Sequence, residues 1–599
     1  MTVMKAIIRS TGLLAAGILL ALFTVHGQAL YQSFEVNPVS DRFVHLPVKK
    51  GASKTWMTVN VDGVLQHEFE IELAPEKPDF YATLETGHWA GKKLTLTAES
   101  IAQGSDWLNF IKMSDQMSDE ETVYTEKYRP QFHFSPRRGW TNDPNGLHYY
   151  KGIYHLFYQH NPYGTGWGNM TWGHAISTDL FHWNEKPDAV LPDKNGVSFS
   201  GSAAVDWKNS SGLQEDPLFD ENGKLTYPPQ VAFYTSTNAN RGIGPAAQSL
   251  AYSLDEGRTW IKYRGNPVIP HITGGNRDPK VFWYEDEHDQ SNPYSGRWIM
   301  VLYMDGQDFA LFSSCNLIRW EKLSDIKNAG YECPDMFELP VDGDINDTRW
   351  IFWEAGGKYL IGSFNGKEFL KESGPHLAKY GGNDYAAQTF SDIPATDGRR
   401  IMLSWMSGGE YPGMPFNQQF SIPRNLTLRS TDNGIRLFME PVKEIEKLRI
   451  SKPIKFSKKL KGEDRSARLK LDGELFDLEL TFTLAPDAML DTMNVIRTEI
   501  FRQNIMYNPG TRTIELEGVK APLIPVNNQV KLRLIIDRTS IELFANDGIV
   551  QISKCFINED KAPANMTISG RPGLARFTVN AFNLKSVWRN HTERSEFQD

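Results

Sequence analysis

The sequence predicts an all-β protein, and three observations support that prediction. Short runs of alternating apolar and polar residues recur along the chain, separated by turns such as Asp62-Gly63. A degenerate hairpin pattern repeats between residues 127 and 430. Aromatic residues, which favour strands, make up 12% of the chain. Together these features indicate a β-propeller that is preceded by a small N-terminal β-domain and followed by a C-terminal β-sandwich.

Length, charge and cysteine content narrow the class of protein. A chain of 599 residues is too long for one hydrophobic core and predicts about two to four domains. The net charge of -9, without a clustered basic stripe, argues against nucleic acid as a partner. Cys315, Cys333 and Cys555 are too few for a disulfide framework and lack metal-ligand spacing.

Residues 1–28 are typical of a secretory signal peptide. Lys5 and Arg9 form its positive region, residues 13–25 its apolar core, and small residues near Gly27 its cleavage site. A membrane anchor is the alternative, but this apolar run is short for a spanning helix, and no later stretch is long enough. We expect an exported chain, periplasmic, secreted or cell-surface associated, with no membrane span after cleavage and with its oligomeric state left open.

Residues 30–115 are predicted to form the N-terminal β-domain. Period-two alternation over residues 56–61 and 67–73 indicates two strands joined by a turn. The segment contains no acid cluster suited to catalysis, so we interpret it as a structural or docking module. The acidic, polar residues 114–126 then form a linker to the next domain.

Residues 127–435 are predicted to form the propeller. The repeated pattern is a strand that ends in a small residue and Ser, then a tight turn, then an aromatic residue that opens the next strand. Its copies end at Trp183, Trp260 and Trp320, with a weaker copy at Phe369. Hairpins recurring every ~40–80 residues are typical of propeller blades.

Acidic residues occupy equivalent points of this repeat. Asp143, Asp278 and Glu332 lie 40, 42 and 37 residues before the closing aromatic residue of their respective hairpins. Residues 199–202 have the same phase in the second blade, and residues 383–385 have it in a fifth. Equivalent inner-strand positions converge on the central channel of a propeller. We therefore expect the three acids to share one pocket.

Three carboxylates among aromatic residues suit glycoside cleavage. One carboxylate attacks the anomeric carbon while a protonated partner supplies a proton to the leaving oxygen. Neighbouring negative charge raises the pKa of one acid and keeps it protonated. Taken alone, Asp143 is explained by an Asn-Asp-Pro turn at a strand entry. A functional role for Asp143 is favoured because Asp278 and Glu332 occupy equivalent points of the repeat.

Residues 446–595 are predicted to form the β-sandwich. Residues 476–482 and 531–537 alternate cleanly, and turn sequences occur at residues 508–510 and 546–548. We interpret this domain as a support for the propeller, with sugar binding as the alternative.

Seven motifs occur in an order that resembles one known family. They are Trp140-Thr141-Asn142-Asp143-Pro144-Asn145-Gly146, Phe157-Tyr158-Gln159-His160-Asn161-Pro162, Trp167-Gly168-Asn169-Met170-Thr171-Trp172-Gly173-His174, Phe199-Ser200-Gly201-Ser202, Arg277-Asp278-Pro279, Glu332-Cys333-Pro334-Asp335 and Asp384-Tyr385-Ala386-Ala387-Gln388-Thr389-Phe390. Residues 127–595 thereby resemble glycoside hydrolase family 32, the β-fructofuranosidase group of invertases, inulinases and levanases. Thr141 stands where Met is commoner. The N-terminal β-domain resembles an extension on some gut Bacteroidetes members.

The resemblance implies a five-bladed propeller, anomeric retention, no metal and no cofactor. It implies that Asp143 is the nucleophile, Glu332 the acid/base and Asp278 the transition-state stabiliser. The implied substrate-binding residues are Asn142, Gln159, Trp167, Phe199, Ser200, Arg277 and Trp405. The implied substrate is a β-D-fructofuranoside such as levan, inulin, a fructo-oligosaccharide or sucrose, attacked from the chain end. An endo-acting levanase is the alternative, and the preferred linkage and the balance of hydrolysis against fructosyl transfer remain open.

Two remote alternatives belong to other classes. Residues 253–260 look like the Asp-box of sialidases, but the in-phase positions are carboxylates and not the Tyr nucleophile and arginine cluster of that group. A fructan-binding protein without catalysis is the second alternative. The presence of all three acids argues against it.

Overall fold

The structure, a computed structural model, describes residues 5–6, 21–26, 29–99, 101, 105–117, 122–221, 225–237, 244–286, 291–292, 295–450, 452–463, 465–559 and 564–588. The regular elements of these residues are strands and four 3₁₀ helices, which confirms the all-β prediction. Of the predicted signal peptide, residues 1–28, only the strands β1 (Lys5–Ala6) and β2 (Ala21–His26) are described. The rest of that prediction lies outside the described residues.

The N-terminal domain consists of two small sheets, ordered β1-β2-β3-β8-β5-β6 and β7-β4-β9. Buried and half-buried residues alternate along the whole of β5, because a strand turns successive side chains to opposite faces. The elements are β3 (Ala29–Val36), β4 (Phe43–Val48), β5 (Thr55–Val61), β6 (Val64–Ile71), β7 (Phe80–Glu85), η1 (Gly87–Trp89), β8 (Leu94–Ala98), η2 (Trp107–Asn109) and β9 (Lys112–Ser114).

The central domain is a propeller of five antiparallel blades, each of four strands. The first blade has β10 (Gly139–Tyr150), β11 (Ile153–Asn161), β12 (Thr171–Ser177) and β13 (Asn184–Val190), and the second has β14 (Val197–Val205), β15 (Gln230–Thr237), β16 (Ala246–Ser253) and β17 (Ile261–Lys262). The third has β18 (Arg277–Tyr284), β19 (Arg297–Asp305), β20 (Asp308–Ser314) and β21 (Glu321–Ile326). The fourth has β22 (Asp335–Val341), β23 (Asp344–Trp353), β24 (Lys358–Phe364) and β25 (Phe369–Leu377), and the fifth has β27 (Tyr385–Thr389), β28 (Arg400–Trp405), β30 (Arg424–Thr431) and β31 (Gly434–Pro441).

The ring closes where the first and fifth blades meet. The backbone N–H of Leu147 in β10 donates to the side chain of Gln388 in β27, and His148 forms a parallel bridge with Ser391. A short strand, β29 (Phe416–Asn417), pairs in parallel with the start of β10. The innermost strands β10, β14, β18, β22 and β27 therefore surround one channel.

The Ser-turn-Trp pattern of the repeat has a direct structural cause. The hydroxyls of Ser177, Ser253 and Ser314 accept backbone N–H groups of the turns that follow them. Trp260 and Trp320 donate their indole N–H to turn carbonyls three residues back. Side-chain bonds of this kind stabilise tight turns, so the pattern recurs wherever a blade makes its third hairpin.

Four of the five inner strands contain a β-bulge near their start. Register shifts occur between Thr141 and Pro144, Ser198 and Gly201, Arg277 and Lys280, and Tyr385 and Gln388. In the fourth blade, the loop before β22 holds the corresponding residues 332–334. Because a bulge redirects side chains out of the ladder, these equivalent positions all face one end of the channel.

The C-terminal domain is a β-sandwich with sheets ordered β26-β41-β40-β39-β34-β43-β32 and β33-β42-β35-β36-β37-β38. Strand β26 (Lys379–Gly382) comes from the propeller and pairs in parallel with β41. The other elements are η3 (Lys443–Leu448), β32 (Ile454–Lys459), β33 (Ser466–Lys470), β34 (Phe476–Leu484), η4 (Ala488–Leu490), β35 (Ile496–Ile500), β36 (Gln503–Asn508), β37 (Thr513–Leu516), β38 (Val519–Pro522), β39 (Gln529–Asp537), β40 (Ser540–Ala545), β41 (Val550–Cys555), β42 (Asn565–Ser569) and β43 (Ala575–Asn583).

Buried charges join the propeller to the sandwich. Arg424 lies 2.6 Å from Asp384 and 2.9 Å from Glu542, and His133 lies 2.9 Å from Glu542 and 2.7 Å from Asp537. All five side chains are completely buried. A buried charge without its partner is strongly destabilising, so this network holds the two domains in one relative position.

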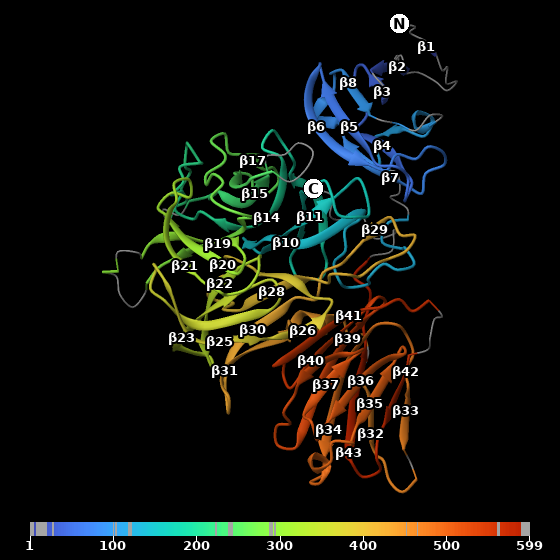
Figure 1. The fold of residues 1–599 in the computed structure, drawn as a ribbon, viewed down its shortest axis with the longest axis vertical. Coiled ribbons are helices and arrows are strands. Elements are labelled where there is room, and N and C mark those ends of the chain that lie inside the picture. Colours follow the sequence, from blue (N-terminus) through green and yellow to red (C-terminus); the bar gives the residue numbers. More distant parts are fainter. Residues whose placement is uncertain are drawn as a thin grey trace.

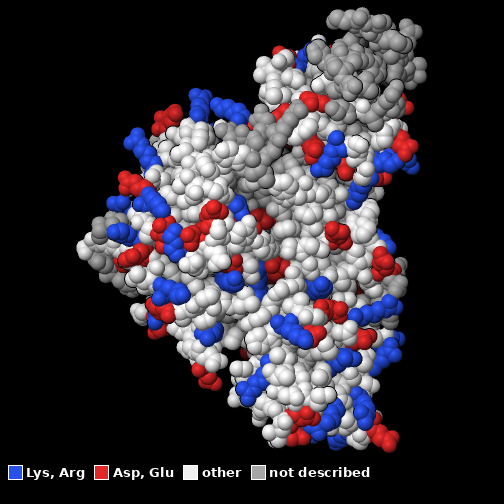
Figure 2. Space-filling view, in the orientation of Figure 1, with Lys and Arg blue, Asp and Glu red and all other residues white. Residues whose placement is uncertain are grey.

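The three domains are arranged as three separate lobes (Figure 1). The N-terminal domain sits on one rim of the propeller, and the sandwich lies against another side, with β26 and β41 next to each other. On the face shown in Figure 2, Lys and Arg side chains are interspersed with Asp and Glu side chains. Among the described residues, no helix has the length and apolar content needed to cross a membrane.

Candidate active site

The structure brings the three predicted acids to one end of the propeller channel. Asp143 lies in the bulge of β10, Asp278 in the bulge of β18, and Glu332 in the loop before β22. The thiol of Cys333 lies 3.6 Å from Oδ2 of Asp143 and 3.4 Å from Oδ2 of Asp278. The Arg277 guanidinium lies 3.7 Å from Asp278 and 2.6 Å from Glu332. One thiol and one guanidinium thus connect carboxylates from three blades.

The Asp143 carboxylate is held by neutral hydrogen-bond donors. Ser200 donates to Oδ2 at 2.6 Å, and the amide of Asn142 donates to Oδ1 at 3.1 Å. The indole of Trp140 donates to the Asn142 side chain at 3.1 Å, which orients that amide. Donors of this kind fix the direction of the carboxylate without adding a positive charge beside it.

Asp278 is held in a left-handed backbone conformation, with φ of 62°. Its backbone N–H donates to the Thr235 hydroxyl at 2.9 Å, and its carboxylate accepts the backbone N–H of Cys333 at 3.0 Å. The residue is only 6% exposed. Non-glycine residues rarely adopt this conformation, so the surrounding contacts stabilise a backbone that the residue alone would avoid.

Glu332 is bound on both of its oxygens. Tyr385 donates its hydroxyl to Oε1 at 2.7 Å, and Arg277 donates to Oε2 from two guanidinium nitrogens at 3.0 and 2.6 Å. The Arg277 side chain is itself fixed by the carbonyl of Gly275 at 2.7 Å. The Glu332 side chain is 20% exposed, so it is accessible from the channel end.

Burial and mutual repulsion raise the pKa of two of these acids. Burial raises the pKa of Asp143; the hydrogen bond from Ser200 opposes the rise, and the charge of Glu332 adds to it. Burial is also the largest cause at Asp278, where the charge of Glu332 helps raise the pKa to about 7 although Arg277 opposes it. Closely spaced buried carboxylates oppose one another's ionisation. Such repulsion favours a protonated and an ionised carboxyl in one cluster, which is the combination that a proton donor and a nucleophile need.

The remaining predicted residues make other contacts. Gln159 is 1% exposed and donates to the carbonyl of Ser198 in β14, two residues before Ser200. The Trp405 ring lies 6.2 Å from that of Trp140, and its indole N–H donates to Gln418. Trp167 is 52% exposed and its ring lies 6.1 Å from that of Phe199. Neither Gln159 nor Trp167 has a hydrogen bond to the three acids in the described structure.

Two residues outside the predicted set contact the carboxyl groups of the acids directly. Tyr385 binds Glu332, and its ring lies 6.4 Å from that of Trp405. Cys333 touches both aspartates. The repeat phase had already placed residues 383–385 at the channel, so a signal for Tyr385 existed. No sequence signal indicated that the Cys333 thiol would lie between the two aspartates.

Asp335, the last residue of the acid-containing motif, has a structural role. It accepts the backbone N–H of Thr389 at 2.6 Å and lies 3.4 Å from the ammonium group of Lys280. Lys280 also donates to the carbonyl of Thr389 at 2.8 Å. The pair is completely buried and connects the third, fourth and fifth blades below the acids.

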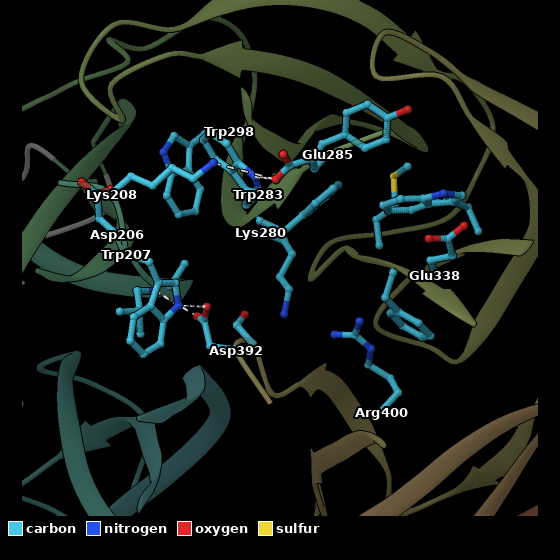
Figure 3. A pocket seen from close by; sticks show the side chains of 18 residues that line it. Asp206, Trp207, Lys208, Lys280, Trp283, Glu285, Trp298, Glu338, Asp392 and Arg400 are labelled. Carbon is cyan, nitrogen blue, oxygen red and sulfur yellow. Dashed lines mark hydrogen bonds and ion pairs between the residues drawn. The ribbon is translucent and has the colours of Figure 1, made fainter. Parts of the chain in front are cut away.

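A separate cavity of about 440 Å³ opens beyond this pair, along the later part of the inner strands (Figure 3). Lys280 and Arg400 point into it, and Asp392 accepts the indole N–H of Trp207 at 3.0 Å. None of the three predicted acids lines this cavity. We therefore assign the chemistry to the other end of the channel.

Comparison with known proteins gives consistent matches. Residues 133–441 match the model of the glycosyl hydrolases family 32 N-terminal domain, and residues 444–570 match glycosyl hydrolases family 32 C terminal. A levanase of Bacillus subtilis (strain 168) is 37% identical over 513 residues, covering 78% of this chain and 72% of the levanase. An extracellular exo-inulinase of Aspergillus niger is 30% identical over 534 residues, covering 78% of this chain and 96% of its own.

Solved structures agree with these matches. The crystal structure of exo-inulinase from Aspergillus awamori superposes with a TM-score of 0.67 at 28% identity, covering 78% of this chain and all of the inulinase. A fructofuranosidase from Schwanniomyces occidentalis complexed with fructose gives a TM-score of 0.65 at 28% identity, again covering 78% of this chain and all of the other. Both family models begin after the N-terminal β-domain.

Proposed function

The chain belongs to glycosyl hydrolase family 32, and on that premise we propose that it is a retaining glycosidase that releases fructose from β-D-fructofuranosides. The observation that carries the proposal is the cluster of Asp143, Asp278 and Glu332, contributed by three blades and connected by Cys333 and Arg277. Retaining glycosidases need one carboxylate as a nucleophile and a second as an acid and then a base.

In the first step, Asp143 attacks C2 of the terminal fructosyl unit. The bond from C2 to the leaving oxygen breaks, and Glu332 gives its proton to that oxygen. Asn142 and Ser200 hold the Asp143 carboxylate in one direction, which reduces the reorganisation needed for attack. The products of this step are a fructosyl ester of Asp143 and the shortened chain.

In the second step, Glu332, now ionised, removes a proton from a water molecule. The resulting oxygen attacks C2, the ester bond breaks, and Asp143 leaves as a carboxylate. Two inversions at C2 restore the β-configuration. Asp278 binds ring hydroxyls and strengthens its hold as positive charge develops on the sugar.

We propose that the substrate is a fructan and that cleavage occurs from the chain end. Support comes from the levanase of Bacillus subtilis and the exo-inulinases of Aspergillus among the relatives. Export from the cell is part of the same proposal, since those Aspergillus relatives are extracellular. A secreted enzyme can reach a polymer that does not cross the cell membrane.

Product analysis on levan and inulin tests the substrate and the mode of attack. Free fructose as the sole early product supports attack at the chain end, whereas a ladder of oligosaccharides indicates an endo-acting levanase. NMR of the first-formed sugar tests retention separately. The β-anomer is expected, and an initial α-anomer would exclude the two-step route through Asp143.

A further inference from the structure

The N-terminal domain is locked onto the propeller by an aromatic side chain. Tyr163, from the loop between β11 and β12, packs into the hydrophobic core of the N-terminal domain and is 6% exposed. Its ring stacks on Phe69 of β6 with a centroid distance of 3.6 Å. Its hydroxyl lies 3.3 Å from a ring nitrogen of His67. A propeller residue that completes the core of another domain holds the two domains together.

Hydrogen bonds fix the same loop to the edge of β6. The Asn169 amide donates to the carbonyl of Glu70 at 2.7 Å, and its oxygen accepts the Glu70 backbone N–H at 2.9 Å. A second link joins Lys50 of the N-terminal domain to the carbonyl of Met414, at 2.5 Å. Trp167 lies within this fixed loop, between Tyr163 and Asn169.

A groove of about 560 Å³ lies between the two domains. One wall belongs to β5 and β6 of the N-terminal domain, and the other to the propeller loop and the start of β14. Trp56, Leu65 and Glu68 line the first wall, and Trp167, Lys194 and Phe199 line the second. The groove is therefore a product of the domain contact and exists in neither domain alone.

The side chains of this groove suit a carbohydrate chain. Trp56, Trp167 and Phe199 supply flat apolar rings, and Trp167 is 52% exposed. Glu68, Gln66 and Lys194 place a carboxylate, an amide and an ammonium group beside these rings, where they can bind hydroxyl groups. Sites that recognise small polar molecules combine apolar and aromatic walls with a few placed polar groups. The mixed charges favour a neutral hydroxylated ligand over a polyanion.

Strand β14 connects the groove to the candidate active site. Phe199 lines the groove, and the next residue, Ser200, donates to the Asp143 carboxylate at 2.6 Å. We propose that the groove binds the part of a β-fructan chain beyond the bond that is cleaved, so that the N-terminal domain supplies distal substrate subsites. This inference rests on the proposed function and names the part of the substrate that the extra domain recognises.

Kinetics with short and long substrates test the proposal. The measured quantity is kcat/KM for a long fructo-oligosaccharide divided by kcat/KM for sucrose, because on this proposal only the longer substrate reaches the wall that the N-terminal domain contributes. Trp56→Ala is expected to lower this ratio roughly fivefold or more, through lost contact with the distal sugars. Leu65→Ala, at a residue that is 52% exposed, provides a second variant with little effect on folding.

The matched control is Tyr81→Ala, which removes a half-buried aromatic ring from β7, outside the groove. It is expected to keep the wild-type ratio. An unchanged ratio in Trp56→Ala and Leu65→Ala, in proteins that melt like the wild type, would overturn the proposal. Equal losses on sucrose and on the oligosaccharide would overturn it as well, because they would show an effect on the whole fold.

A binding measurement separates this proposal from the proposed function. The long oligosaccharide is titrated into Glu332→Gln and into Glu332→Gln/Trp56→Ala, and the dissociation constants are compared. A larger dissociation constant, meaning weaker binding, in the double variant supports substrate binding in the groove. Equal constants contradict it. If the wild-type protein hydrolyses neither sucrose nor the oligosaccharide, the proposed function itself is contradicted.

Discussion

At the scale of single residues, Glu332 is the side chain whose proposed role has the sharpest chemical test. Replacement by Ala removes the proton donor, and general acid-base catalysis of this kind is worth about 10²–10⁴ in rate. We expect Glu332→Ala to lose that factor in kcat on sucrose while remaining folded. Azide should restore turnover of a fructoside with a good leaving group, because it attacks the Asp143 ester without needing a base.

The product of that rescue identifies the residue's role. A β-fructosyl azide is expected, since azide would replace water in the second step only. Asp143→Ala is the matched control, because it lacks the nucleophile and should give no β-fructosyl azide. Normal sucrose turnover by either alanine variant would contradict the assigned roles.

The buried carboxylate of Asp278, which the proposed reaction needs, lowers the stability of the folded protein when it is ionised. Its pKa is raised to about 7 by burial and by the charge of Glu332, whereas an unfolded Asp titrates near 4. The folded state therefore binds more protons than the unfolded state between about pH 4 and pH 7, and stability falls as pH rises through that window. At pH 8, Asp278→Asn should raise the unfolding free energy by at least about 1 kcal/mol, since each pKa unit is worth about 1.4 kcal/mol.

Asn is a suitable replacement because it tolerates the left-handed backbone of position 278 and can still accept the N–H of Cys333. Thermal unfolding at pH 8 and at pH 4 measures the effect. The gain should shrink at pH 4, where the wild-type carboxyl is protonated. The same variant should lose most of its activity, and a variant less stable than wild type at pH 8 would contradict the argument.

At the scale of elements, the bulge in β14 positions Ser200 against Asp143. It depends on Gly201, where an added Cβ would lie 1.9 Å from the carbonyl oxygen of Phe233 in the paired strand. Gly201→Ala must therefore push β14 away from β15. We expect a loss of at least about 2 kcal/mol in stability, together with lower activity, because the Ser200 hydroxyl moves with the strand.

Chemical denaturation and sucrose turnover measure these two effects. Gly166→Ala is the control for stability, since a Cβ there would meet nothing within 4 Å. A Gly201→Ala protein as stable and as active as the wild type would show that the bulge does not depend on close backbone approach.

The bulges also explain how much of the site could be predicted from the sequence. The turn pattern marks the same point in each blade. The acids lie at similar distances before Trp183, Trp320 and Phe369, and the structure brings these acids together. The all-β fold and the propeller were predicted for the same reason and are confirmed. The catalytic and binding roles of these residues stay predictions.

Other features leave no local signal. The Cys333 thiol contacts two aspartates from a turn in which Glu332 and Cys333 have φ of 38° and 42°, and no sequence pattern predicts that turn. The groove depends on Tyr163 entering the core of a separate domain. Contacts between domains combine residues far apart in sequence, so no periodicity reveals them.

At the scale of the whole molecule, the junction of propeller and sandwich should titrate as one unit. Burial alone would lower the pKa of His133, but hydrogen bonds to Asp537 and Glu542 raise it to about 9. The folded state thus retains a proton that the unfolded state, with a histidine pKa near 6.5, releases. The stability that this proton contributes is fully present below about pH 6.5 and is lost as pH rises through about 9.

We therefore expect the melting temperature of the full protein to fall between about pH 6.5 and pH 9, and His133→Gln to reduce the slope of that fall. At pH 6 the variant should be less stable by at least about 1 kcal/mol, because it leaves Asp537 and Glu542 buried without a positive partner between them. His182→Gln is the matched control, because His182 pairs with Asp179 on the surface. Calorimetry across this pH range measures both variants. If the His133→Gln profile is parallel to the wild-type profile, the junction does not act as the titrating unit, and the pH dependence must arise elsewhere in the molecule.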